Sequence, residues 1–235
     1  MKKFIISIDQ GTTSSRVVLF DTKGNIKFIS QYEFKQYFPR NGWVEHNPNE
    51  IWSTTLKALK QVIKKAISLK GHILTIGITN QRETTILWNK KTGKPIYNAI
   101  VWQDRRTQEY CKSLKNKNYE NTFRKKTGLF IDPYFSATKI KWILDNVKIS
   151  KKLLKSNNLL FGTVDTFLIW KLTKGKHHLT EATNASRTML FNINNNKWDN
   201  EILQKLKIPK NILPEVKNSA DNFGKTDKKV TGKEI

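Results

Sequence analysis

Short apolar runs near the amino terminus are separated by turns that contain glycine. The runs cover residues 4–9, 17–21 and 26–34, with Gly11 in the first turn and Gly24 in the second. Apolar runs of this length joined by such turns predict an antiparallel meander of strands. The chain is therefore expected to open with a sheet.

A helix is predicted after the meander. Asn47 can cap it, Pro48 occupies its first position, and Glu50 stands three residues after the cap, as in a capping box. Apolar residues then recur at spacings of four and three, which would place one apolar stripe against the sheet. The stripe consists of Trp52, Leu56, Leu59, Ile63 and Ala66.

The rest of the pattern alternates strands with helices. Helices are expected at 105–117 and 136–147, and a third from near Asp165 to Lys174 and Gly175. After about residue 217 the apolar pattern is lost, which indicates a loop. This order predicts an α/β fold with a mixed central sheet flanked by helices. Further strands are expected at 72–80, 84–89, 96–102 and 159–163.

The composition favours a packed domain. Hydrophobic residues make up 37% of the chain, with 7 Trp and 12 Phe, whereas a disordered chain has few aromatic residues. No apolar run approaches the ~18 residues that cross a bilayer, and Asp9 interrupts the first run too early for a signal peptide. The single cysteine, Cys111, excludes an internal disulfide and a cysteine-built metal site. A reducing cytoplasm is the expected setting.

The formal net charge of +24 raises the alternative of a nucleic-acid or polyanion binder. Only seven of the 43 basic residues are Arg, however, and the lysines are spread along the whole chain. Arg forks onto phosphates and base edges, whereas scattered Lys is usual on a solvated surface. A compositional bias at surface positions explains the charge better, so no specific nucleic-acid partner is expected.

The segment from Asp9 to Arg16 carries the strongest local signal for chemistry. A strand ends in a carboxylate, a glycine turn presents hydroxyls and amides, and an arginine follows. Glycine lets the backbone approach an anion, amides donate to phosphate oxygens, and a carboxylate such as Asp9 can hold hydrated Mg²⁺. The spacings of a Walker loop and of a dinucleotide fingerprint are absent. Taken alone, the segment fits a polar hairpin turn without a ligand equally well.

Six ordered motifs carry a family resemblance. DQGTTSSR (9–16) resembles the phosphate-binding hairpin of sugar kinases in the actin-like ATPase superfamily, which implies a ribonuclease H-like domain. The other five resemble glycerol kinases of the FGGY carbohydrate kinase family, and residues 134–146 also fit the general FGGY signature. The resemblance extends from about residue 3 to about residue 225. These five motifs are GITNQRETT (77–85), YNAIVWQDRRT (97–107), GLFIDPYFSATKIKWILDN (128–146), FGTVDTFLIWKLT (161–173) and TNASRTMLFNI (183–193).

The resemblance implies a glycerol site. Arg82 and Glu83 would grip the hydroxyls, Tyr134 would hydrogen-bond glycerol, and Trp102 would pack on its carbon chain. A triol suits one residue that only donates beside one that accepts. Without the resemblance, the first two residues would be a surface ion pair and Tyr134 a core aromatic.

The resemblance also implies a nucleotide site. Thr12, Thr13, Ser14 and Arg16 would serve the phosphates of ATP, and Asp9 would lie near Mg²⁺. The implied reaction converts MgATP and glycerol to ADP and sn-glycerol 3-phosphate, in glycerol catabolism. Such a transfer needs positioning, charge neutralisation and a base for the hydroxyl proton.

The chain departs from the family at its end. The family's catalytic base belongs to a Gly-Asp-Gln segment expected shortly after Ile235, so we assign no catalytic residue here. Residues 1–235 are expected to be an FGGY amino-terminal domain, truncated near its carboxy-terminal end and without the second nucleotide-binding domain. An inactive truncated remnant stays open as an alternative, as does another FGGY sugar kinase, and a homo-oligomer is expected only of a full-length form.

Several polar residues are expected to have no ligand. Asp165 is interpreted as a helix cap and Asp104 as a solvated surface residue, since neither falls on a family ligand position. The four histidines lack the spacing of metal ligands with a third partner.

Overall fold

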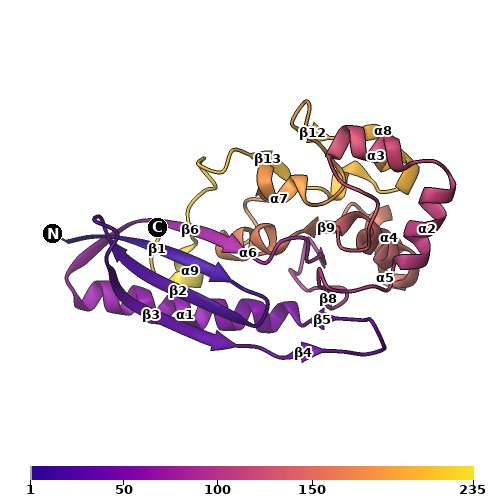
Figure 1. Ribbon diagram of the computed structural model, residues 1–235. Helices are drawn as coiled ribbons and strands as arrows, with labels where there is room; N and C mark the ends of the chain where they lie inside the picture. Colours follow the sequence, from indigo (N-terminus) through magenta and orange to yellow (C-terminus); the bar gives the residue numbers. More distant parts are fainter. Residues whose placement is uncertain (1) are drawn as a thin grey trace.

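The computed structural model describes residues 2–235 of the chain (Figure 1). Its long strands and its longest helix form one end of an elongated molecule, and most of the other helices gather at the other end. Each end has its own cluster of buried apolar side chains. The first includes Trp88 and Phe167 beside the long strands, and the second includes Phe123, Phe161 and Phe191.

The central sheet contains strands β1 (Lys2–Gln10), β2 (Ser14–Asp21), β3 (Ile26–Glu33) and β6 (Gly71–Asn80). Its order is β3-β2-β1-β6, with the first three antiparallel and β6 parallel to β1. The predicted meander and mixed sheet are thus confirmed. Because β1 and β6 are parallel, their last residues, Gln10 and Asn80, are direct partners at the same end of the sheet.

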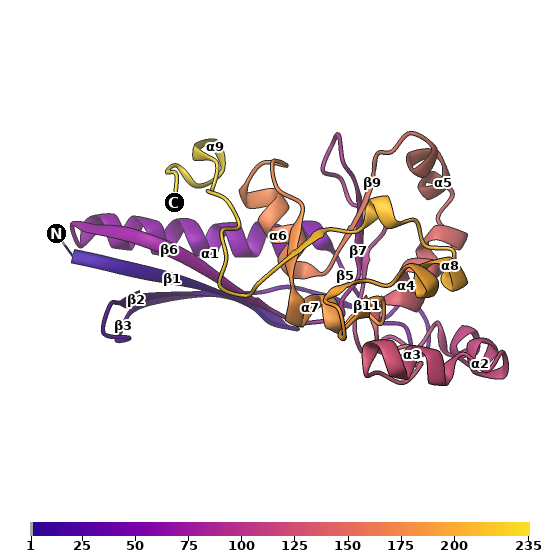
Figure 2. The same cartoon turned by 90° about the horizontal axis from the view of Figure 1, so that it is seen from above.

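Helix α1 (Pro48–Ser68) runs along one side of this sheet (Figure 2). Asn47 caps it as predicted, because its Oδ1 accepts the backbone amide of Asn49 at 2.9 Å. The capping-box prediction is wrong for Glu50. Its carboxylate instead accepts the Tyr37 hydroxyl at 2.5 Å and the Lys35 backbone amide at 3.2 Å.

The apolar stripe of α1 is rotated slightly from its predicted position. Leu59, Ile63 and Ala66 are buried as expected, whereas Trp52 and Leu56 lie at the margin and are only partly buried. The face against the sheet is completed by other residues. These are Ile51, Thr55, Ala58 and Val62.

The rest of the chain forms shorter strands and helices. Strands β7 (Ile86–Asn89) and β9 (Leu159–Gly162) pair antiparallel, and α4 (Ser136–Asn146) and α6 (Val164–Leu172) form near their predicted positions. The remaining elements are β4 (Gln36–Tyr37), β5 (Glu45–His46), β8 (Ala99–Ile100), α2 (Gln108–Asn116), α3 (Glu120–Thr127), α5 (Lys148–Lys155), β10 (Leu179–Glu181), α7 (Ala182–Ser186), β11 (Phe191–Asn192), β12 (Lys197–Trp198), α8 (Asn200–Leu206), η1 (Lys210–Ile212), β13 (Glu215–Lys217) and α9 (Lys228–Thr231).

The short helices were the elements least visible in the sequence. Helices α3, α5, α7 and α8 were not predicted, and α9 forms one turn inside the tail that was expected to be loop. Each has eight residues or fewer. Helices this short are held by packing more than by their own periodicity.

Asp165 does not cap α6, which corrects the prediction. The cap position is Thr163, and Asp165 lies inside the first turn, almost fully buried. Its carboxylate accepts hydrogen bonds from the hydroxyls of Thr163 and Thr180, the latter at 2.6 Å. Burial raises the pKa of Asp165, against the opposing effect of these hydroxyls.

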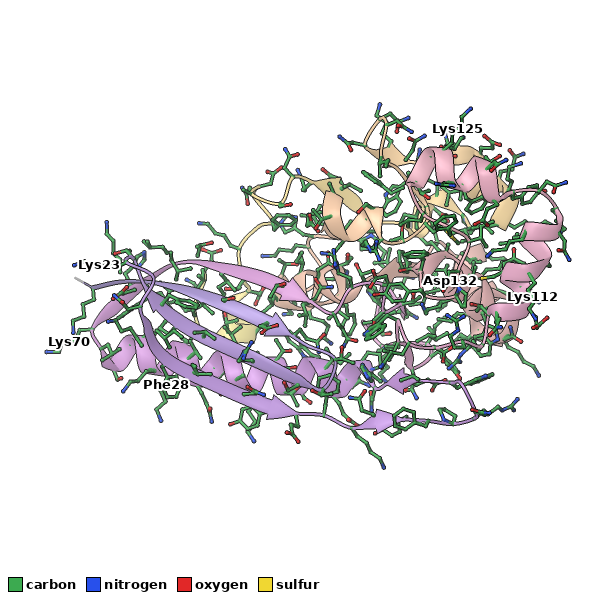
Figure 3. All side chains as sticks on the ribbon, viewed as in Figure 1. Lys23, Phe28, Lys70, Lys112, Lys125 and Asp132 are labelled. Carbon is green, nitrogen blue, oxygen red and sulfur yellow. The ribbon has the colours of Figure 1, made fainter. Side chains whose placement is uncertain are left out.

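The basic charge is distributed over the whole molecule. Figure 3 shows Lys23 and Lys70 at the sheet end and Lys112 and Lys125 on helices at the other end, all exposed. This distribution matches the scatter of lysines along the sequence. Across residues 2–235, no helix combines the length and the apolar character that crossing a membrane requires.

Candidate functional site

The turn between β1 and β2 lies at the carboxyl ends of β1 and β6. The Gly11 amide closes the turn by donating to the Ser14 carbonyl at 2.9 Å. Gln81, the first residue after β6, binds the turn from the side. Its backbone amide donates to the Gln10 carbonyl at 2.7 Å, and its Nε2 donates to the Gly11 carbonyl at 3.1 Å. Ligands commonly bind outside the carboxyl ends of strands in open α/β sheets.

All four predicted phosphate-binding residues lie on this turn or at the start of β2. Gln36 Nε2 donates to the Thr12 carbonyl at 2.9 Å, so that acceptor is already occupied. Gln31 Nε2 donates to the Ser14 hydroxyl oxygen at 3.1 Å, which leaves the hydroxyl proton of Ser14 available. The groups left for a ligand are mainly donors, as an anion requires. The four residues are Thr12, Thr13, Ser14 and Arg16.

Asp9, the predicted metal residue, pairs across the sheet with Arg16. The Oδ2 atom accepts from Arg16 Nε at 3.1 Å and from its Nη2, and both side chains are partly exposed. The Oδ1 atom of Asp9 has no hydrogen-bond donor among residues 2–235. One open carboxylate oxygen fits Mg²⁺, which usually takes one or two carboxylates together with water and phosphate oxygens. The described residues contain no cluster of three or more potential ligands from His, Cys, Asp and Glu.

Trp102 connects the phosphate turn to the predicted glycerol residues. Its indole Nε1 donates to the Thr12 hydroxyl oxygen at 3.2 Å, and its ring packs on Tyr134 with centroids 5.5 Å apart. Thr12, Trp102 and Tyr134 come from three separate segments of the chain. Because Thr12 accepts from the indole, its own proton remains free to donate to a ligand.

The side chains of Arg82 and Glu83 lie in different surroundings, one exposed and the other buried. Arg82 is exposed and makes no side-chain hydrogen bond or ion pair within the described residues, so it does not form the surface ion pair with Glu83 that was the alternative to glycerol binding. Glu83 is only 2% exposed, and its Oε1 accepts from Arg187 Nε at 2.6 Å. Arg187 also lies over the ring of Tyr134, at 5.7 Å from its centroid. The arginine therefore links Glu83 to the pair of aromatic rings.

A buried lysine fixes the backbone that carries Tyr134. Lys139 is fully buried, and its Nζ donates to the backbone carbonyls of Pro133, Tyr134 and Phe135. The distance is 2.7 Å to the Pro133 carbonyl and 3.3 Å to the Phe135 carbonyl. The three N–H groups of an ammonium match these three acceptors. Burial lowers the pKa of Lys139 to about 7, while the negative charge of Asp104 acts in the opposite direction.

Asp104 is buried, which corrects the prediction of a solvated surface residue. It is 1% exposed and accepts from Arg106 Nε and from the Arg106 backbone amide, both at 2.9 Å. Arg106 Nη2 also donates to Glu45 at 2.7 Å. The guanidinium carbon lies 3.7 Å from the centroid of Trp43 and 4.7 Å from that of Trp142. This cluster fixes the loop that carries Trp102.

His46 is a buried residue that contacts Gln36 and Gln81, the two glutamines that bind the turn. It is fully buried, it hydrogen-bonds Gln36, and its Nδ1 lies 3.3 Å from Gln81 Nε2. Burial lowers the pKa of His46 to about 4, so the ring is neutral near pH 7. A neutral ring can accept at one nitrogen and donate at the other. His46 therefore supports both glutamines that hold the turn.

Sequence reasoning assigned no role to Arg187, Lys139, Gln81 or His46. Arg187 and Lys139 stand inside the motifs that carry the resemblance, and Gln81 stands in GITNQRETT. For Arg187 a signal was available in the sequence, because it is one of only seven arginines in a lysine-rich chain. For the other residues, the signal was their position within or near these motifs. Their contacts depend on tertiary structure.

Comparison with known proteins gives consistent matches over the whole chain. The profile of the FGGY family of carbohydrate kinases, N-terminal domain, matches residues 4–234. The glycerol kinases of Petrotoga mobilis and Borrelia duttonii are 55% and 56% identical over 235 and 233 residues, which are 100% and 99% of this chain. The chain spans about half the length of these curated relatives, 47% of each.

Solved structures give the same result for the fold. The crystal structure of Plasmodium falciparum glycerol kinase with ADP superposes with a TM-score of 0.93 at 37% identity, over 100% of this chain and 47% of that one. Gluconate kinase from Lactobacillus acidophilus superposes with a TM-score of 0.87 at 23% identity, over 99% of this chain and 45% of that one, and supports the fold alone. The sheet is thus that of the actin-like ATPase fold, as the sequence predicted. With a family profile matched from residue 4 to residue 234 on that fold, this chain belongs to the FGGY family of carbohydrate kinases.

Proposed function

We propose that this chain provides the polyol-binding and phosphate-binding residues of a kinase that phosphorylates glycerol at the expense of ATP. The contact between Thr12 and Trp102 carries the proposal, since it brings the phosphate turn against the pair of rings formed by Trp102 and Tyr134. A donor-rich turn directly beside two aromatic rings that can cover a polyol suits transfer of a phosphoryl group to a hydroxyl. The similarity to glycerol kinases supports glycerol as the acceptor.

Each residue has a role in this proposal. Trp102 packs on the carbon chain of glycerol and Tyr134 hydrogen-bonds glycerol, while Arg82 donates to the hydroxyls and Glu83 accepts from them. Thr12, Thr13, Ser14 and Arg16 donate to the phosphates of ATP, and Asp9 holds Mg²⁺ through a carboxylate oxygen. ATP supplies the phosphoryl group, and Mg²⁺ neutralises charge on it.

We assign no catalytic base within residues 2–235. The proposal therefore treats this chain as one lobe, an FGGY amino-terminal domain whose site works against a second nucleotide-binding domain. A cytoplasmic setting is part of the proposal and is supported by the single cysteine, which is free and buried.

An NMR titration of the 235-residue chain tests the polyol site. Indole ¹⁵N–H signals are recorded with glycerol, xylulose or gluconate, and Trp102→Phe assigns the signal of Trp102. Glycerol is expected to move the Trp102 signal at lower concentration than the other two ligands. Trp198 is the internal control, because its indole donates to the Pro214 carbonyl at 2.8 Å outside the site. Equal shifts of both signals, or none at Trp102, would contradict the proposed site.

A chimaera tests the proposed reaction. Residues 1–235 are joined to the remaining half of the Petrotoga mobilis glycerol kinase, which is 55% identical over the matched region. The chimaera is expected to form sn-glycerol 3-phosphate from MgATP and glycerol. Arg82→Ala is expected to raise the KM for glycerol far more than the KM for ATP. Equal increases would refute the role given to Arg82, and preference for another polyol would identify a different FGGY sugar kinase.

A further inference from the structure

We propose that Arg187 is a positioning residue for Glu83, and that it leaves one Glu83 carboxylate oxygen open for a substrate hydroxyl. This inference rests on the proposed function, because it defines how the polyol site is oriented. The arginine that contacts Glu83 comes from 104 residues further along the chain.

The two carboxylate oxygens of Glu83 have different surroundings. Oε1 accepts from Arg187 Nε at 2.6 Å. Oε2 has no hydrogen-bond donor among residues 2–235. In this part of the chain, the fully buried side-chain polar atoms without a partner are Trp88 Nε1 and Thr166 Oγ1, so Oε2 is not fully buried. Oε2 therefore reaches solvent although the residue is 2% exposed. One oxygen is anchored and the other is accessible.

The backbone of Glu83 is held as firmly as its side chain. Its φ of +62° lies in the left-handed region, which is uncommon for a residue with a side chain. Ser136 Oγ donates to the Glu83 carbonyl at 2.9 Å and so ties this residue to the start of α4. Such conformations persist where the surroundings fix them, and they are frequent at binding sites. The direction of the Glu83 side chain is thus set at both ends.

Arg187 is suited to positioning because its guanidinium is itself fixed. It lies over the rings of Phe135 and Tyr134, at 5.0 and 5.7 Å from their centroids. Only its Nε is used in a hydrogen bond within residues 2–235, and its side chain is 28% exposed. A charge-assisted hydrogen bond is short and directional, so it fixes the rotation of the carboxylate. Tyr134 and Glu83, both proposed to contact glycerol, are therefore arranged around one arginine.

Other charged groups near Glu83 do not replace this contact. Arg82 is exposed and forms no bond to Glu83. Lys139 is buried nearby, but its Nζ donates to three backbone carbonyls. Removing Arg187 should therefore leave the Glu83 carboxylate without a directional partner. It would then rotate, and its open oxygen would no longer face a bound polyol in a fixed direction.

A double-mutant cycle on the 235-residue chain tests this inference. Glycerol affinity is measured by the Trp102 indole titration for wild type, Arg187→Met, Glu83→Gln and the double variant. Arg187→Met alone is expected to weaken binding about tenfold to a hundredfold, the range for losing a charged hydrogen bond. In the Glu83→Gln background the same change is expected to cost less than about twofold, because Arg187 acts only through Glu83.

Two controls separate positioning from a general structural role. Arg124→Met removes an exposed arginine of α3 that lies over the ring of Phe130, and it should leave glycerol affinity unchanged. Ethylguanidinium should restore binding to Arg187→Ala but should not improve binding by Glu83→Gln. A structural defect would not respond to the added cation.

The outcomes are distinguishable. Independent, additive losses in the cycle would overturn the role of Arg187 while leaving the glycerol site intact. Failure of wild type to bind glycerol would overturn the proposed function, and this inference with it. Coupled losses with rescue by ethylguanidinium would support Arg187 as the residue that orients Glu83.

Discussion

Arg106→Met tests whether the buried charge cluster holds the loop that carries Trp102. Arg106 donates four hydrogen bonds to Asp104 and Glu45 at 2.7 to 2.9 Å, three from its guanidinium and one from its backbone amide. The side chains of Arg106 and Asp104 are 0% exposed, and that of Glu45 is 3% exposed. Methionine keeps much of the volume between Trp43 and Trp142 but removes the charge. The change would leave two buried carboxylates without their cation.

The expected cost follows from that burial. Removing one partner of a buried ion pair typically lowers the free energy of unfolding by about 3–5 kcal/mol, because the remaining charge is desolvated and unpaired. The loss of the stacked guanidinium acts in the same direction. We therefore expect Arg106→Met to lower the free energy of unfolding by at least ~3 kcal/mol.

The neighbouring arginine is a matched control. Arg105 pairs with Asp132 at 3.2 Å, but its side chain is 48% exposed and that of Asp132 is 39% exposed. Arg105→Met should cost at most about 1 kcal/mol, as is usual for an exposed pair. Both variants are compared with wild type by urea denaturation followed by circular dichroism. If Arg106→Met costs no more than Arg105→Met at an unchanged m-value, the cluster does not stabilise this loop and our reasoning is refuted.

Three further predictions concern protonation, packing and reactivity. Burial lowers the pKa of His46 from 6.5 to about 4, so on acidification the unfolded chain takes up the proton before the folded chain does. The free energy of unfolding should therefore fall as the pH drops through that range, by up to about 3 kcal/mol. Urea midpoints measured at pH 7 and pH 5 should show a smaller fall in His46→Gln than in wild type. Gly162→Ala would place a Cβ 2.5 Å from the Cβ of Thr166 and should cost about 1–3 kcal/mol in thermal unfolding, whereas an unchanged melting temperature would contradict this packing. Burial raises the pKa of the Cys111 thiol to about 11, so Ellman's reagent at pH 8 should react slowly with the folded chain and rapidly in urea.

Local sequence determined the parts of the fold that rest on neighbouring residues. The glycine turn between β1 and β2 and the Asn47 cap of α1 are set by residues close in the chain, and both formed as predicted. The mixed sheet followed from the order of the strands and helices. The ordered motifs, read together, identified the family, and two of the residues they named, Trp102 and Thr12, are in contact in the structure.

Pairings between distant residues could not be predicted from the sequence. Asp104 and Asp165 both looked like ordinary polar residues, and each is buried only because segments far apart in the chain pack around it. Glu50 left its expected capping role because Tyr37 lies within hydrogen-bond reach in the folded chain. In each case the partner of a charged group is set by packing, which the local pattern does not contain.

The site shows the same division. The sequence by itself determined which chemical groups are present, a donor-rich turn, two aromatic rings, and an arginine beside a glutamate. Only the tertiary structure decided that Glu83 bonds to Arg187 and that Trp102 bonds to Thr12. These contacts join residues 104 and 90 positions apart, and such a pairing arises only when the sheet and the helices bring their ends together at one place.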